Sequence, residues 1–467
     1  MYKNEKLEEF EKYMEGKKVA IIGLGVSNIP LLDYFYQTKS DISVFDNRNK
    51  EQLESEIIEK IEKYDIHTYL GKENLQHLKG FDIIFRSPSA MPFIPEIEEE
   101  IKRGAIVTSE IEMVLKLSPS KIIGVTGSDG KTTTTSLIYH IMKKGGYHCF
   151  LGGNIGTPLF TEIKNMRPED VVVLELSSFQ LMDMDISPMV SVITNVTPNH
   201  LNVHRSYEEY IDAKKNIFKS QNEKGIVVLN YDNDITRNFA KEVKGKTIFF
   251  SSREKLDNGY IYDREDEMIK YCEDGVRRHI ISKKDILLRG IHNYENICAA
   301  LAATSSFVDF DLQIKAIKEF SGVEHRLEFV REVNGAKWYN DSIGTSPTRT
   351  IAGLYAYDEN IVLIAGGYDK HLDYEPIGKP IVEKVGTLIL LGATAPKIEE
   401  ATRKALNQEG KVMPIYVCDT LEQAVNLARD KSKMGDVVLF SPASASFDLF
   451  KNFMERGEKF KELVNQL

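Results

Sequence analysis

Residues 121–144 read KIIGVTGSDGKTTTTSLIYHIMKK, and this stretch decides the fold class. The β-branched run 121–125 is typical of a buried strand, residues 127–130 of a glycine-rich loop, and residues 135–144 of a helix. A strand that leads through such a loop into a helix offers backbone N–H groups, a lysine and hydroxyl groups to a chain of phosphates. Val125 stands where the usual phosphate loop has glycine. The stretch still predicts an ATP-binding loop made of Gly127, Ser128, Asp129, Gly130, Lys131, Thr132 and Thr133.

Similar apolar runs recur on both sides of this loop, each followed by a polar turn and a segment with helical periodicity. Such alternation is typical of α/β folds with parallel sheets. One hydrophobic core stops growing near 250 to 300 residues, and the chain has 467, so we expect three α/β domains. The predicted strands are 18–22, 42–45, 81–85, 121–125, 171–174, 190–193, 226–229, 361–364, 387–391 and 437–440.

The expected domain boundaries lie where a stretch of sequence typical of a strand gives way to one typical of a helix, or the reverse. The first is near Ser109, ahead of the helical segment IEMVLKL, and the second is near Gly322. The predicted domains are therefore 1–109, 110–322 and 323–467. Residues 250–290 are polar, with alternating strand and turn signals, which predicts a small antiparallel appendage on the central domain.

Composition excludes several classes of protein. With 60 basic and 70 acidic residues the net charge is −10, which argues against a dedicated nucleic-acid binder. The four cysteines form no CxxC pair, so neither a zinc site nor a disulfide framework is expected. The amino terminus is charged, and no window reaches the ~18 apolar residues of a membrane span. We expect a cytoplasmic protein that is not inserted in a membrane.

Two further patterns indicate ligand binding. Gly23 to Asn28 follow a predicted strand and resemble a dinucleotide turn, with Asn28 in place of the third glycine. A nicotinamide, a nucleotide diphosphate or a purely structural turn would each be compatible with it. Glu175 and residues 194–200 follow other buried strands, at the sheet edge where open α/β sheets bind ligands. A carboxylate beside a phosphate loop is a natural ligand for Mg²⁺.

Ten motifs in order along the chain resemble those of the Mur ligase family. They are TGSDGKTT, GGNIG, LELSSFQL, NVTPNHL, YIDAKKNIF, HNYENICAA, GVEHRLE, NDSIGTSP, AGGYDK and SPASASFDLFKNF. The likeness covers essentially the whole chain, and the GxGxS turn at Gly23 to Ser27 and the SPASASFDLFKNF ending are most similar to the D-glutamate-adding branch. It implies a Rossmann-like amino-terminal domain for a UDP-sugar, a central P-loop ATPase domain, and a Rossmann-like carboxyl-terminal domain for the amino acid.

The resemblance also implies an activity. Members of this branch use ATP, with two Mg²⁺ ions expected here, to join D-glutamate to UDP-N-acetylmuramoyl-L-alanine through an acyl phosphate, in cytoplasmic peptidoglycan precursor synthesis. We expect the protein to be a monomer.

Site residues are carried over from the matching motifs. Lys131 would hold the β- and γ-phosphates, Thr132 and Glu175 one Mg²⁺, and His200 the second, with Lys214 as a carbamate. The remaining implied contacts are Asn293, Asn296, Arg326 and Asp341 for the nucleotide; Val26, Ser27, Asp46, Asn47, Arg48, Asn154, Ser177 and Gln180 for the UDP-sugar; and Thr345, Lys370, Ser446, Phe447 and Phe453 for D-glutamate. Asp341 is also expected to take part in catalysis.

Several positions depart from the family pattern. Asn199 and Asn202 stand where an Asp-His-x-Asp pattern is frequent. Ile343 stands where many relatives carry lysine, and Ser89 replaces the glycine of the commoner Ser-Pro-Gly turn. Alternatives of the same class are ligases for another amino acid and folylpolyglutamate synthase-like enzymes. An alternative of a different class is a nucleotide-binding relative without turnover. A nicotinamide oxidoreductase would leave the phosphate loop unexplained.

Overall fold

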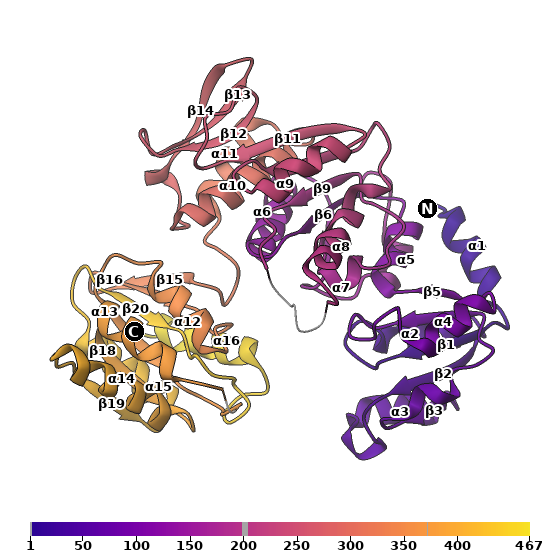
Figure 1. Cartoon of the computed structure of the whole chain (residues 1–467). Coiled ribbons are helices and arrows are strands. Elements are labelled where there is room, and N and C mark those ends of the chain that lie inside the picture. The colour runs from indigo at the N-terminus through magenta and orange to yellow at the C-terminus, as the bar shows by residue number, and fades with distance from the viewer. Residues whose placement is uncertain (1, 199–203, 371) are drawn as a thin grey trace. The chain divides into compact units, whose positions relative to one another are not determined.

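The computed structural model describes residues 2–198, 204–370 and 372–467, in two compact units. The first unit comprises Met1–Ile286 with Ile291–Lys318, and the second comprises Leu287–Gly290 with Glu319–Leu467. The first unit contains a five-stranded and a nine-stranded sheet, and the second contains a six-stranded sheet (Figure 1). The predicted α/β class with three sheet-based domains is confirmed.

The amino-terminal sheet is entirely parallel, in the order β3-β2-β1-β4-β5. The strand order reverses direction at β1, which is where open α/β sheets form a ligand crevice. Its elements are α1 (Glu5–Met14), β1 (Lys18–Ile22), α2 (Ile29–Gln37), β2 (Asp41–Asp46), η1 (Lys50–Gln52), α3 (Ser55–Lys63), β3 (His67–Leu70), η2 (Asn74–His77), β4 (Ile83–Arg86), α4 (Pro95–Lys102) and β5 (Ile106–Thr108).

Strand β1 shows why these runs form a central strand. Val19 and Ile21 belong to one apolar cluster, and Ala20 and Ile22 belong to another. Successive side chains of a strand point to opposite faces, so β1 is covered on both sides. A parallel strand buried on both faces needs a continuous apolar run, as the sequence has here.

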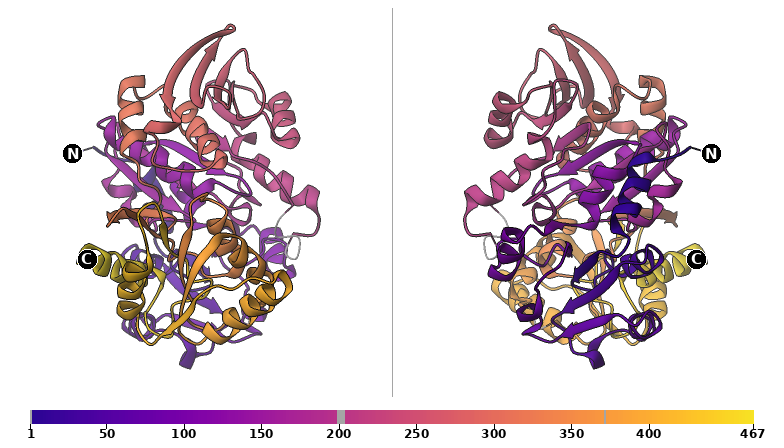
Figure 2. Two further views of the ribbon diagram at one scale, coloured as in Figure 1. Left: turned by 90° about the vertical axis from the view of Figure 1, so that its left-hand side faces the viewer. Right: turned by 90° about the vertical axis from the view of Figure 1, so that its right-hand side faces the viewer.

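The central sheet has the order β14-β13-β12-β11-β10-β9-β6-β8-β7. Strands β12 to β14 are antiparallel to one another, as expected for residues 250–290, and β12 also pairs with β11, so they extend the sheet. Figure 2 shows the β13–β14 hairpin projecting at the end of this sheet. The strands are β6 (Lys121–Thr126), β7 (Cys149–Gly153), β8 (Val171–Glu175), β9 (Val190–Ile193), β10 (Ile226–Asn230), β11 (Lys246–Ser251), β12 (Gly259–Asp263), β13 (Met268–Glu273) and β14 (Val276–Ser282).

The helices of the central region connect these strands. The phosphate-loop helix α6 packs against α10. The helices are α5 (Glu110–Leu117), α6 (Lys131–Lys144), η3 (Phe160–Asn165), α7 (Ser178–Leu181), α8 (Tyr207–Lys219), α9 (Asp234–Phe239), η4 (Ala240–Glu242), η5 (Lys283–Asp285), α10 (Ile291–Thr304) and α11 (Phe310–Glu319).

The second unit is built on the sheet β15-β16-β20-β17-β18-β19, in which only β15 and β16 are antiparallel. Leu363 of β17 lies in one apolar cluster, and Val362 and Ile364 lie in another, so this sheet is also covered on both faces. Its elements are β15 (Glu328–Val333), β16 (Ala336–Asn340), α12 (Pro347–Leu354), β17 (Ile361–Ala365), η6 (Glu375–Ile377), α13 (Gly378–Lys384), β18 (Val385–Leu391), α14 (Ala395–Glu409), β19 (Ile415–Cys418), α15 (Leu421–Lys431), β20 (Val437–Phe440) and α16 (Phe453–Asn465).

Two general features bear on function. All four cysteines are free thiols. Within residues 2–198, 204–370 and 372–467, no helix has both the length and the apolar character that crossing a membrane requires.

Candidate functional site

The glycine loop lies between β6 and the amino terminus of α6, as the sequence predicts. Gly127 has a φ of +152°, and a Cβ there would lie 1.9 Å from Thr194 Oγ1. Gly130 caps α6 with a φ of +79°. Only glycine adopts such backbone without strain, and the loop leads directly into the unpaired N–H groups of the helix. Those groups form an anion-binding site.

Residues that follow β9 hold this loop in place. Asn195 Oδ1 accepts a 2.9 Å hydrogen bond from the N–H of Asp129, and Thr194 Oγ1 donates to the Asp129 carbonyl at 2.5 Å. Ser128 Oγ donates to the carbonyl of Thr197 at 2.9 Å. Lys131 Nζ donates to the carbonyls of Gly127 and Ser128 at 3.0 and 3.1 Å, so its ammonium lies over the loop.

Helix α10 reaches the same loop through two predicted asparagines. Asn296 Oδ1 accepts a 3.2 Å hydrogen bond from Thr134 of α6, and Asn296 Nδ2 donates to Asn293 Oδ1 at 3.3 Å. A Cβ on Gly130 would lie 2.4 Å from Asn296 Oδ1. The structure therefore brings Asn293 and Asn296 to the loop that they are predicted to serve.

Glu175 ends β8 with its carboxylate buried. Its Oε1 accepts a 2.9 Å hydrogen bond from Asn154 Nδ2, whereas its Oε2 has no hydrogen-bond partner among the described residues. A buried carboxylate oxygen without a donor is costly unless a cation neutralises it. Oxygen ligands of this kind suit Mg²⁺. Thr132, the other residue predicted for this ion, lies half-buried in the first turn of α6.

Lys214 of α8 is also buried at the loop. Its Nζ donates to the Gly127 carbonyl at 2.8 Å and lies 4.6 Å from the centre of the Tyr210 ring. Burial, reinforced by the charge of Lys131, lowers the pKa of the Lys214 amine to about 7. A large fraction of this amine is therefore uncharged at neutral pH. His200, predicted for the second Mg²⁺, lies outside the described residues.

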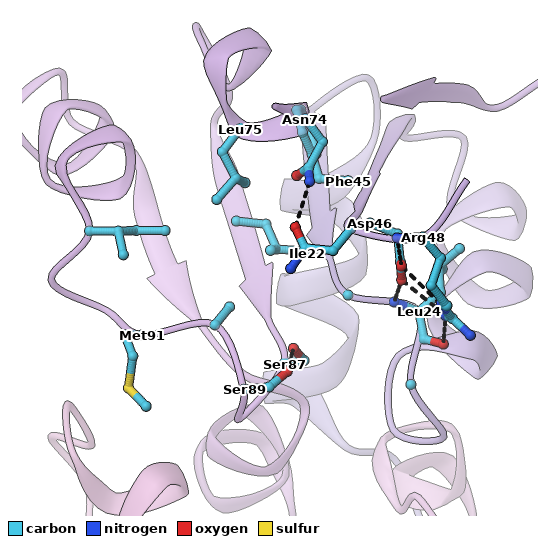
Figure 3. A pocket seen from close by; sticks show the side chains of 15 residues that line it. Ile22, Leu24, Phe45, Asp46, Arg48, Asn74, Leu75, Ser87, Ser89 and Met91 are labelled. Carbon is cyan, nitrogen blue, oxygen red and sulfur yellow. Dashed lines mark hydrogen bonds and ion pairs between the residues drawn. The ribbon is translucent and has the colours of Figure 1, made fainter. Parts of the chain in front are cut away.

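A second site is a cavity of about 530 Å³ at the carboxyl ends of β1, β2 and β4 (Figure 3). Asp46 accepts a 2.8 Å hydrogen bond from the Leu24 N–H and two more, at 2.9 and 3.0 Å, from the Arg48 guanidinium. Burial alone would raise the pKa of Asp46, but these donors outweigh it and lower the pKa. Asp46 therefore stays ionised and fixes the turn after β1.

The cavity contains some predicted residues and some that were not predicted. Asp46, Asn47 and Arg48 line it, while Val26 and Ser27 are not among its lining residues. Asn28, in place of the third glycine, donates to the carbonyls of Ile22 and Gly23 at 3.2 and 2.9 Å and so closes the turn. The additional polar lining residues are Asn74, Ser87 and Ser89. Asn74 donates to Asn47 Oδ1 at 2.9 Å but stands in no motif that could have identified it.

Asn154, Ser177 and Gln180, predicted for the sugar side, all lie near the end of β8. Asn154 orients Glu175, as described above. Ser177 caps α7: its Oγ accepts from the Gln180 N–H at 3.3 Å, while Gln180 Oε1 accepts from the Ser177 N–H at 2.9 Å. This reciprocal capping box fixes the start of α7 just after Glu175.

In the second unit, the predicted residues lie at the carboxyl ends of β16, β17 and β20. Asp341 is buried and accepts from Ser441 Oγ at 2.6 Å and from the Leu327 N–H at 3.3 Å. Burial raises the pKa of Asp341 to about 6. Lys370 Nζ lies 5.5 Å from the centre of the Phe447 ring, so these two predicted D-glutamate residues are brought together.

Arg456 of α16 organises this part of the second unit and was not predicted. Its guanidinium donates to the carbonyls of Ser342, Ser444 and Ala445 at 2.8 to 3.0 Å. Arg456 thus joins the segment just before Thr345 to the segment just before Ser446. The carbonyl of Phe453 accepts a 2.8 Å hydrogen bond from Ser342 Oγ. Arg326 lies beside this region, and its N–H donates to the Val323 carbonyl.

Comparisons with known proteins agree along the whole chain. Residues 17–109 match the Mur ligase MurD-like N-terminal domain, residues 125–304 the Mur ligase middle domain, and residues 325–444 the Mur ligase glutamate ligase domain. The chain is 50% identical to the UDP-N-acetylmuramoylalanine--D-glutamate ligase of Acetivibrio thermocellus over 99% of both chains. It is 47% identical to the enzyme of the same name from Clostridium acetobutylicum over 98% of both.

Solved structures are similar in fold. The UDP-N-acetylmuramate-alanine ligase MurC of Thermotoga maritima matches with a TM-score of 0.56 at 18% identity, over 96% of this chain and 99% of that one. The MurF ligase of the same organism, solved in complex with ADP, matches with a TM-score of 0.52 at 18% identity, over 98% and 96%. From its matching domains and its full-length relatives, the chain belongs to the Mur ligase family and, within it, to the MurD type.

Proposed function

We propose that this protein is an ATP-dependent ligase that joins D-glutamate to UDP-N-acetylmuramoyl-L-alanine and releases ADP and phosphate. The observation that carries the proposal is that Lys131 and Lys214 both donate to the Gly127 carbonyl of the glycine loop, while Glu175, with an unpaired buried oxygen, lies beside Val125 of the strand that leads into this loop. Full-length relatives named for this reaction, about half identical to the chain, support the choice of substrates. The fold and the loop alone would suit several ligases.

The proposed chemistry has two steps. A carboxylate oxygen of the UDP-sugar substrate attacks the γ-phosphorus of ATP. The bond between this phosphorus and the β-phosphate oxygen breaks, so that ADP leaves and the substrate becomes an acyl phosphate. The amine of D-glutamate then attacks the acyl carbon, loses a proton, and expels phosphate as the amide forms. Phosphoryl transfer depends mainly on positioning and on neutralising charge. The amides of the loop and the ammonium of Lys131 would supply both.

Two Mg²⁺ ions are part of the proposal. Glu175 and Thr132 would hold one and His200 the other, with Lys214 contributing as a carbamate. The unpaired Oε2 of Glu175 fits a bound cation, and a carbamate would replace an ammonium that repels Mg²⁺ by an oxygen ligand. When bound, Mg²⁺ would neutralise the negative charge of the phosphates. The uncharged form of Lys214 favoured by burial is the form that can react with CO₂.

The domain limits 1–109, 110–322 and 323–467 are proposed as the units that bind the UDP-sugar, ATP and the amino acid. The cavity near Asp46 and Arg48 supports the first of these roles. The gathering of Lys370 and Phe447 supports the third. The assignment of Arg326 and Asp341 to the nucleotide remains a prediction. We further propose a cytoplasmic location, because ATP and UDP-sugars are cytoplasmic metabolites, and a monomeric state.

Phosphate release tests the proposed function. The protein is incubated with ATP, Mg²⁺ and UDP-N-acetylmuramoyl-L-alanine, together with D-glutamate, L-glutamate, L-alanine or a diamino acid in separate reactions. We expect phosphate release only in the reaction that contains D-glutamate, and we expect mass spectrometry to detect the amide product there. Faster release with another amino acid would assign a different ligase, and no release with any of them would favour a relative without turnover.

A further inference from the structure

Arg86 is a buried cation at the end of β4, and two of its partners, Phe179 and Asp183, lie 93 and 97 residues further along the chain. Its side chain is 1% exposed. Its Nε donates to Asp183 Oδ2 at 2.9 Å, and its Nη2 contacts the other oxygen of the same carboxylate. The guanidinium also donates to the carbonyls of Ala90 and Phe179 at 3.1 and 3.3 Å. These four contacts of Arg86 bridge two regions of the first unit.

Each of these regions belongs to one part of the proposed substrate site. Ser87, Ser89 and Ala90 line the cavity assigned to the UDP moiety (Figure 3). Phe179 lies in α7, the helix that begins at Ser178 just after Glu175, and Asp183 follows that helix directly. Arg86 itself is not among the residues that line the cavity. Arg86 therefore contacts the two segments of the protein that flank the ends of the proposed substrate site, and not the substrate itself.

A second contact fixes the far end of the same loop. The guanidinium carbon of Arg205, just before α8, lies 3.7 Å from the centre of the Phe93 ring. Residues 87–93 are thus tied to the central region at both ends, by an ion pair next to α7 and by a cation–π contact next to α8. Lys214 belongs to α8. The loop that lines the nucleotide cavity is therefore connected to two of the helices around the phosphate loop.

We propose that Arg86, paired with Asp183, is a positioning residue that sets the separation between the UDP cavity and the reacting carboxylate. This inference rests on the proposed function. A substrate held at its nucleotide end can react only if its other end meets the γ-phosphate in line, and a displacement of about 1 Å can cost a hundredfold in rate. Lysine would not replace this group, because a single ammonium cannot bond both carboxylate oxygens and two carbonyls in one plane.

Three variants test the inference, with one matched control. Arg86→Met removes the donors and keeps an unbranched side chain, Arg86→Lys keeps only the charge, and Asp183→Asn removes the charge of the partner. Lys60→Met is the control, because it removes a cation that pairs at 2.8 Å with Asp33 in the same domain and away from the cavity lining. For each, kcat and KM are measured with UDP-N-acetylmuramoyl-L-alanine, and the Kd of UDP alone by calorimetry.

The expected result is a loss of rate without a loss of UDP affinity. Arg86→Met should lower kcat about 10- to 100-fold, Arg86→Lys and Asp183→Asn should lie between it and the wild type, and UDP should bind all of them within about threefold of the wild type. Asp183 is partly exposed, so Asp183→Asn decides the matter if Arg86→Met fails to fold.

Two results would overturn the inference. One is a kcat within about twofold of wild type in the folded Arg86 and Asp183 variants, and the other is an equal fall in UDP affinity and kcat, which would make the pair a support of the cavity only. The failure of the proposed function would look different, because the unsubstituted protein would then release no phosphate.

Discussion

Replacing Lys214 by alanine should remove most of the ligase activity, and the burial of the amine explains why. With a pKa of about 7 in place of the usual 10.5, about half of the Lys214 amines are uncharged at pH 7, against about one in three thousand for an exposed lysine. Only the uncharged amine reacts with CO₂, so its burial favours carbamate formation. Without the oxygen ligand, kcat should fall at least about a hundredfold.

The pH dependence provides an independent measurement. The uncharged fraction rises from about one-tenth at pH 6 to about nine-tenths at pH 8 for a group of this pKa. Carbamate occupancy, followed by ¹³C NMR with ¹³C-labelled bicarbonate, should rise over the same interval and disappear in Lys214→Ala. Acetate should restore part of the activity of Lys214→Ala by placing a carboxylate in the vacated space.

Lys215 is the matched control, because it is the next residue on α8 and pairs with Glu242 at 2.7 Å on the surface. Adjacent helical residues point about 100° apart, so Lys215→Ala should keep kcat within about twofold. An active wild-type enzyme with no ¹³C signal on Lys214 at pH 8 would refute the carbamate. In that case, Lys214 would act as an amine that donates to the Gly127 carbonyl.

Three further predictions concern other residues. Lys131→Ala should lower kcat about a thousandfold in the phosphate-release assay, and near-wild-type release would show that the triphosphate binds elsewhere. Lys370→Ala should raise the KM for D-glutamate about thirtyfold, because a charged hydrogen bond is worth about 2 kcal/mol. The affinity for ATP should stay unchanged and serves as the control. An unaltered KM for D-glutamate would show that Lys370 is not part of the amino-acid site. Asp341 has a folded pKa of about 6, raised by burial, so its folded state binds more protons than its unfolded state between about pH 4 and 6 and stability is lost as pH rises through that window. Asp341→Asn should therefore raise Tm at pH 7.5 more than at pH 4.5 in thermal denaturation, and an equal change at both pH values would contradict this burial effect.

The central strands could be predicted from the sequence because they are buried on both faces. The runs at β1, β6, β8, β9 and β17 are mostly apolar and almost entirely buried, as is typical of strands inside parallel sheets. Several strands at sheet edges were not predicted, among them β3, β5, β7 and β19. Residues 67–70 of β3 are exposed or half-buried, and β7 contains two glycines, so neither has an apolar run that periodicity could detect.

Site residues were predictable where a motif carries them and were not where only the fold brings them together. The spacing of glycines and lysine in the loop 127–130 and Lys131 is enough to predict phosphate binding. Arg86, Asn74 and Arg456 stand in no such pattern, and their partners Asp183, Asn47 and Ser342 are 27 to 114 residues away in the chain. Their contacts depend on strand order and crossover connections, which a single sequence specifies only through the folded structure.

The outermost strand of the central sheet affects how copies of this protein meet in solution. Strand β14 pairs with β13 on one side only, and residues 276–279 are exposed. An open strand edge can add a strand from a neighbouring molecule. Here Arg277 and Arg278 occupy that edge, so two copies that approached edge to edge would bring guanidinium groups of like charge together. The like charge at this edge therefore opposes edge-to-edge pairing of two copies through the nine-stranded sheet.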